Sequence, residues 1–182
     1  MGKYQRRDKI ARLISWGHWF TFANIILCLF IGLLYIEAAP KPSSAIGNLY
    51  MLVSWVGHFA FLPFVFFIIL IFPFCLVVPY SKILRGFAAL ITSFGLIALI
   101  ADALFFRQYG YHLNTYSLAQ MTRDAEAVFT GASFVIISAI LLGFLLIVGI
   151  QLLLANLAWK RLDDLQNRKI GAPVTAVFVL CF

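Results

Sequence analysis

Charged side chains are scarce in this sequence. Only 12% of its 182 residues are Asp, Glu, Lys or Arg, whereas 63% are hydrophobic and the mean hydropathy is +0.98. A soluble domain carries roughly 25% charged residues, because polar side chains must cover its surface. The composition therefore excludes an ordinary soluble domain and indicates a protein that is surrounded partly by lipid.

The sequence also lacks the short patterns that mark common catalytic and cofactor sites. It has no G-x-S-x-G, H-E-x-x-H, Walker loop or dinucleotide fingerprint. Its cysteines show neither C-x-x-C nor Cys/His spacing and lie in apolar runs, where a thiol packs as a small hydrophobe. They are Cys28, Cys75 and Cys181. We predict no catalytic residue, cofactor or metal site in this chain.

Acidic residues are half as common as basic ones, so that the net charge is +7. In a soluble protein this excess would suggest a nucleic acid partner. Here the Lys and Arg residues form short islands between apolar runs, an arrangement that suits the anionic headgroups of lipids. We predict an anionic, cardiolipin-like phospholipid as a partner and no nucleic acid.

Long apolar runs dominate what is present. An α-helix needs about 20 apolar residues to cross the hydrocarbon core of a membrane. Four runs reach that length, at residues 17–38, 49–80, 83–106 and 132–159. They predict an all-α, polytopic membrane helix bundle over residues 17–182, preceded by a basic head at 1–16. Pro63, Pro73 and Pro79 predict a kinked or tilted helix in the second run, because proline interrupts helical hydrogen bonding.

A fifth apolar run, at residues 173–182, is incomplete. At about 1.5 Å per residue it reaches only halfway through a hydrocarbon core about 30 Å thick. We therefore predict four complete transmembrane helices and a truncated fifth. We expect the chain to be the amino-terminal piece of a longer protein.

The positions of Lys and Arg predict the orientation of the bundle, because cytoplasmic loops carry an excess of both. One side of the membrane would hold the basic head, the connection between the second and third runs, and the connection after the fourth. The other side would hold only Lys41, Arg107 and Arg123. We therefore place the amino terminus in the cytoplasm.

Residues 107–131 form the longest hydrophilic stretch and would lie on the outer side. Asn114 or Thr115 is placed to cap a short helix over residues 116–129, which would lie on the membrane surface. His112, Asp124 and Glu126 suggest a metal or acid–base site, but their spacing matches no ligand motif. We expect a solvated loop here.

Three polar residues lie deep enough in the apolar runs to matter. They are Asn24, His58 and Asp102. His58 and Asp102 would lie at similar depth, so that they would meet across the bundle. Ionisable groups inside a membrane suggest a proton or cation relay, as in a small transporter. We favour an interhelical hydrogen bond or ion pair that fixes packing, because a transport pathway needs more polar lining.

The cations on the cytoplasmic side are the candidates for binding lipid headgroups. They are Lys82, Arg85, Lys160, Arg161, Arg168 and Lys169. Basic pockets between helices bind cardiolipin-type headgroups on that side. The alternative is that these charges only set the topology, and the two interpretations are compatible.

Several short motifs carry a resemblance to a known family. The most specific is Ser15-Trp16-Gly17-His18-Trp19-Phe20. It is followed by Asn24-Ile25, Ile31-Gly32, Gly57-His58-Phe59, Asp102 with Phe105 or Phe106, and His112-Leu113-Asn114. In this order the motifs resemble the YejM/PbgA family, sulfatase-like inner-membrane proteins of Gram-negative bacteria. The similarity covers nearly the whole chain.

The resemblance implies the amino-terminal membrane domain of a multi-pass inner-membrane protein, with residues 107–131 in the periplasm. Members have five transmembrane helices, then a linker and a periplasmic hydrolase-like domain, both beyond this chain. They regulate lipopolysaccharide levels, bind lipopolysaccharide through those further regions, and bind a tetratricopeptide adaptor. The implied function is a non-enzymatic regulator of lipid homeostasis that acts by lipid and protein binding. The alternative is the membrane anchor of a periplasmic sulfatase- or phosphatase-like hydrolase or of a lipid transferase.

Overall fold

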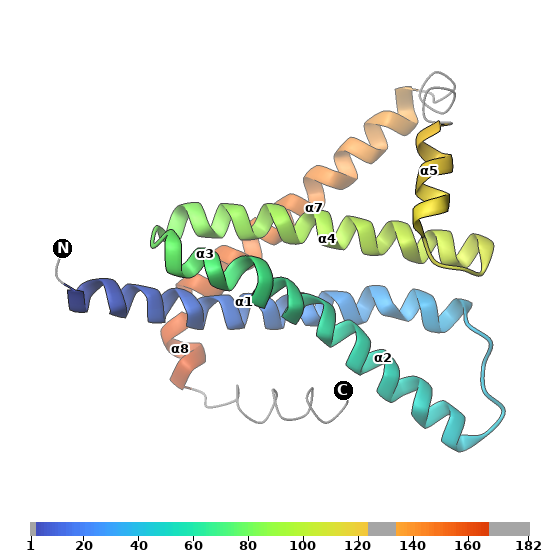
Figure 1. Ribbon diagram of the computed structural model, residues 1–182, viewed down its shortest axis with the longest axis horizontal. Helices are drawn as coiled ribbons and strands as arrows, with labels where there is room; N and C mark the ends of the chain where they lie inside the picture. The colour runs from blue at the N-terminus through green and yellow to red at the C-terminus, as the bar shows by residue number, and fades with distance from the viewer. Residues whose placement is uncertain (1–2, 124–133, 168–182) are drawn as a thin grey trace.

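The structure, a computed structural model, describes residues 3–123 and 134–167 (Figure 1). Within these residues it contains helices and no strand. The helices are α1 (Lys3–Ala38), α2 (Ala45–Phe66), the π-helix η1 (Phe67–Ile71), α3 (Phe72–Val77), α4 (Ser81–Tyr109), α5 (Thr115–Arg123), α7 (Phe134–Lys160) and α8 (Leu162–Asn167).

Four helical segments are long and apolar enough to cross a membrane. They are Gln5–Ala38, Ala45–Val77, Ser81–Tyr109 and Phe134–Lys160. The predicted all-α membrane bundle is therefore confirmed. The predicted incomplete run at 173–182 lies outside the described residues, as do Arg168 and Lys169.

The basic head is not a separate segment. Helix α1 begins at Lys3 and continues without a break through residue 16. Leu13 and Trp16 are almost completely buried, and they recur with Phe20 at helical spacing on one face. Since this face already packs at Leu13, the bundle extends into residues that we assigned to the head.

The second span is irregular where its prolines lie. Pro63 is inside α2, and Pro73 follows the five-residue π-helix η1. Pro73 has no N–H, and its ring would clash with a carbonyl one turn earlier in a regular α-helix. The wider π turn relieves this crowding, and Phe72 N–H donates to Phe67 O, five residues back. The span runs diagonally across α1 (Figure 1).

Helix α1 is the centre of the bundle, since α2, α4 and α7 all pack along it. The larger buried cluster lies at the end that holds residues 3–12, the α3–α4 turn and the α7–α8 junction, which we name the basic end. Its members are Leu13, Trp16, Phe20, Phe67, Ile71, Cys75, Leu84, Ala88, Ala155, Ala158 and Leu162. Toward the opposite end, which holds the α1–α2 and α4–α5 loops, α2 and α7 diverge from α4 (Figure 1).

Candidate functional site: polar clusters along the bundle

A buried polar network joins three helices in the middle of the bundle. Gln151 of α7 donates from Nε2 to Asn24 Oδ1 of α1 at 2.8 Å, and Thr92 Oγ1 of α4 lies 3.0 Å from Gln151 Oε1. Asn24 also donates from Nδ2 to Phe20 O at 3.0 Å, and the Thr92 hydroxyl shares its one proton between Gln151 Oε1 and Ala88 O, the latter at 2.7 Å. The side chains of Asn24, Thr92 and Gln151 are all buried.

This network consists of amide and hydroxyl groups, which do not change charge near neutral pH. It therefore holds the helices together, because Gln151 would lose both of its partners if the helices separated within lipid. We had singled out Asn24 but not its partners. Gln151 was readable from the sequence as a lone amide within a long apolar run, whereas Thr92 gave no such signal.

A second cluster lies at the opposite end, around Asp102 of α4. Its Oδ2 accepts hydrogen bonds from Tyr35 Oη of α1 and from His112 Nδ1, both at 2.7 Å. Its Oδ1 accepts from the backbone N–H of Leu113 at 2.6 Å. An ionised carboxylate only accepts, so His112 Nδ1 carries the proton in this contact. One carboxylate thus connects α1, α4 and the loop after α4.

Two aromatic rings stack against the imidazole of His112. Its ring centroid lies 4.8 Å from that of Phe106 and 5.5 Å from that of Tyr35, with nearly parallel planes. The side chain of His112 nevertheless remains 63% exposed, against 22% for Asp102. This cluster fastens the loop to α1 and α4. Among the described residues, no three His, Cys, Asp or Glu side chains are close enough to hold a metal ion.

The predicted meeting of His58 with Asp102 is wrong. His58 is exposed on α2, and its ring contacts the edge of Phe59, while His112 occupies the position beside Asp102. Gly57, Phe59 and Pro63 form the buried face of α2, so that His58 points away from it. Gly110, whose φ is +76°, ends α4 and turns the chain back toward Asp102. Few residues other than glycine adopt this conformation without strain.

The third cluster lies at the basic end, around Trp159 of α7. The guanidinium carbons of Arg12 and Arg85 lie 5.4 Å and 5.3 Å from its ring centroid, within the range of a cation–π interaction. Arg12 pairs with Asp163 of α8 at 3.0 Å. Arg85 donates to Asn156 Oδ1 at 2.7 Å and to Ser81 O at 3.1 Å. Two guanidinium groups from different helices therefore share one indole.

Three other predicted headgroup residues lie at the same end of the bundle as this cluster. Lys82 in the first turn of α4, Lys160 at the end of α7 and Arg161 directly after it are exposed at the same end. Arg12 was counted in the head and not among the candidates. The four-residue spacing from Arg12 to the buried Trp16 could have indicated that it faces the bundle.

The comparisons with known proteins identify the family. Residues 2–182 match the DUF3413 family, described as a domain of unknown function. The chain belongs to this family. It is 30% identical to the inner membrane protein YejM of Salmonella typhimurium over 185 residues, which are 97% of this chain and 30% of that protein. An uncharacterized protein of Haemophilus influenzae is 30% identical over 187 residues, or 96% of this chain and 30% of the relative.

The resemblance drawn from the sequence motifs is thus confirmed. This member of the DUF3413 family spans 30% of the length of the relatives that it matches. Its four apolar helices and the inner-membrane relative together support a multi-pass inner-membrane protein.

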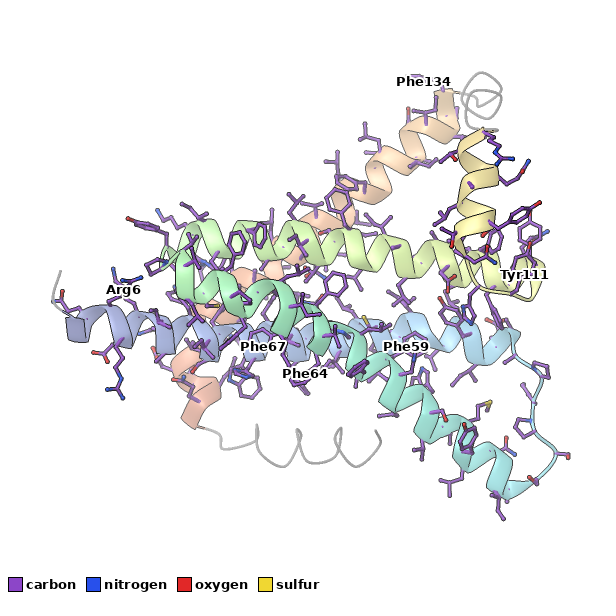
Figure 2. All side chains as sticks on the ribbon, in the orientation of Figure 1. Arg6, Phe59, Phe64, Phe67, Tyr111 and Phe134 are labelled. Carbon is purple, nitrogen blue, oxygen red and sulfur yellow. The ribbon has the colours of Figure 1, made fainter. Side chains whose placement is uncertain are left out.

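The motif at residues 15–20 packs α1 of the DUF3413 domain against its neighbours at the basic end. Trp16 Nε1 donates to Ala155 O of α7 at 2.9 Å, and the Trp16 ring stacks on Phe20. A Cβ on Gly17 would lie 2.5 Å from the ring of Phe67, so only glycine allows this approach. Figure 2 shows Phe67 where the second span crosses α1. The contacts of Trp16 and Gly17 therefore give the motif a role in packing.

Proposed function

We propose that this chain is the membrane domain of an inner-membrane regulator of lipopolysaccharide and lipid homeostasis, which acts by binding lipid and protein. The membership in the DUF3413 family and the likeness to an inner membrane protein support the location. The basic end then faces the cytoplasm, because Lys and Arg are concentrated there.

The observation that carries the lipid-binding part of the proposal is the pair of arginines on Trp159. Among the described residues, Arg12 pairs with the carboxylate of Asp163, and Arg85 is hydrogen bonded to neutral oxygens of Asn156 and Ser81. Both arginines are at the basic end together with the exposed Lys82 and Lys160. A lipid phosphate is the anion available there, and guanidinium groups bind phosphate with directed hydrogen bonds.

The protein partner in this proposal is a tetratricopeptide adaptor, bound from the cytoplasmic side. Lipopolysaccharide would be bound through regions beyond this chain. The relatives are more than three times as long as the part matched here, since that part is 30% of their length. This length favours one further hypothesis, that the chain also anchors a hydrolase-like or lipid-transferring periplasmic domain.

Exchange of single arginines tests the headgroup site. We expect Arg85→Gln and Arg12→Gln to weaken cardiolipin binding by about fivefold to tenfold each, since a charge-assisted hydrogen bond contributes roughly 1.5–3 kcal/mol, part of which is offset by exposure. Binding is measured by native mass spectrometry of the purified chain during titration with cardiolipin.

The matched control is Arg107→Gln, an exposed arginine at the opposite end of α4. It should leave cardiolipin binding unchanged. Equal losses in Arg107→Gln and Arg85→Gln would show that net charge alone attracts the lipid, and would refute the site.

A further inference from the structure

A groove runs along the bundle between α2 and α4, with α1 at its base. Its volume is about 240 Å³. It is lined by Asn24, Cys28, Leu62, Pro63, Phe66, Thr92, Gly95, Leu96, Ala98 and Leu99. Asn24, Cys28 and Leu96 are buried, whereas Leu62, Phe66 and Leu99 are half-buried and Ala98 is exposed. The groove is therefore open along its rim to whatever surrounds the bundle.

The groove follows from the packing of the helices. α2 and α4 each pack along α1, and α2 diverges toward the opposite end (Figure 1). Gly95 keeps the wall of α4 low, because a Cβ there would lie 3.1 Å from the ring of Phe66.

The chemistry of the lining residues and their depth in the membrane indicate which kind of ligand the groove would hold. All lining residues belong to three of the apolar membrane-spanning segments, so that lipid and not water lies at the rim. The lining is almost entirely apolar. The polar side chains in it, Asn24 and Thr92, already bond to Gln151 and to backbone carbonyls. Among the described residues, their hydrogen bonds are all made within the bundle, so that an apolar ligand suits the lining better than a polar one.

The groove suits a slender occupant. A helix with its side chains is about 10–12 Å across, so that at most one of its faces would enter a groove of about 240 Å³. A slender hydrocarbon chain fits, and an empty groove would forfeit the dispersion contacts of its walls.

We propose that the groove holds one acyl chain of a membrane phospholipid, inserted between α2 and α4 against Cys28 and Leu96. This proposal rests on the proposed function only in that both require lipid binding. The groove lies in the middle of the bundle and uses none of the arginines of the headgroup cluster.

The test is photocrosslinking of the full chain in vesicles of phosphatidylethanolamine and phosphatidylglycerol that contain a phospholipid with a diazirine in one acyl chain. Crosslinked peptides are mapped by mass spectrometry. We expect the label on residues 24–28, 62–66 and 92–99. We expect it to be lost in Gly95→Leu, which fills the groove, and in Ala98→Phe, which closes it from the exposed rim without altering the buried wall.

The control is Gly143→Leu on α7, where a Cβ would meet nothing within 4 Å. It should retain the label, and so should Arg85→Gln, which separates this proposal from the headgroup site. Labelling spread evenly over the lipid-facing helices and unchanged in Gly95→Leu and Ala98→Phe would overturn the proposal. Crosslinks from the groove to a second copy of the chain would also overturn it.

Discussion

At the residue scale, whether His58 can reach Asp102 depends on the direction in which its side chain points from α2. Adjacent residues of an α-helix differ by about 100° in direction, because a turn has 3.6 residues. His58 and Phe59 therefore face different sides, and Phe59 is the buried one. The sequence indicated that Asp102 needs a partner in the membrane. It could not indicate which imidazole, because that depends on the turn at Gly110.

We expect Asp102→Asn to loosen the loop at residues 110–114. The amide cannot accept from Tyr35, His112 and Leu113 together, because its nitrogen is a donor. The free energy of unfolding should fall by about 1–3 kcal/mol, the cost of leaving such groups without a partner. Hydrogen exchange of the Leu113 amide and detergent unfolding curves measure both effects.

His58→Ala is the control for this change, because His58 is exposed on the other side of α2. It should leave the exchange of Leu113 and the unfolding curve as in the wild type. If His58→Ala and Asp102→Asn destabilise the protein equally, the assigned partner is wrong.

At the element scale, hydropathy predicted that the spanning helices exist, but packing decides where they begin and bend. The length and the hydrophobicity of an apolar run are local properties, and so they can be read from the sequence. The continuation of α1 through the basic head and the π-helix before Pro73 depend on neighbours: Leu13 packs in the bundle, and the second span must pass α1. Asn114 was readable as a helix cap because capping is local, and its Oδ1 accepts from Ser117 N–H at 2.9 Å.

The network of Asn24 and Gln151 should couple α1 to α7. A double-mutant cycle with Asn24→Ala and Gln151→Ala should give an interaction free energy of about 0.6–1.7 kcal/mol, the range for hydrogen bonds between membrane helices. Each variant and the double variant are compared in unfolding titrations in mixed micelles.

Thr122→Ala serves as a control, since in the described part of the chain its hydroxyl bonds within α5, to Ala119 O. Its effect should add to that of Gln151→Ala without coupling. An interaction free energy near zero between Asn24 and Gln151 would mean that the network does not hold the helices together.

At the scale of the whole molecule, the two ends of the bundle differ in chemistry and in packing. The basic end is closely packed around Trp16 and carries the Arg12–Trp159–Arg85 cluster. The opposite end is splayed, and large apolar side chains of α7 near Phe134 project outward (Figure 2). The positions of Lys and Arg in the sequence indicated this division, because they predicted that the cations gather on one side of the membrane. The pairing of Arg12 with Trp159 could not be predicted, because it joins residues at opposite ends of the sequence.

The central proposal is that the four helices cross the inner membrane with the basic end in the cytoplasm. Its most direct test is maleimide labelling in spheroplasts of two single-cysteine variants, Gln5→Cys in α1 and Ser43→Cys in the α1–α2 loop, with the native cysteines replaced by serine. We predict that a membrane-impermeant maleimide labels Ser43→Cys in intact spheroplasts and Gln5→Cys only after permeabilisation. Labelling of Gln5→Cys in intact spheroplasts would contradict the orientation and, with it, the headgroup site.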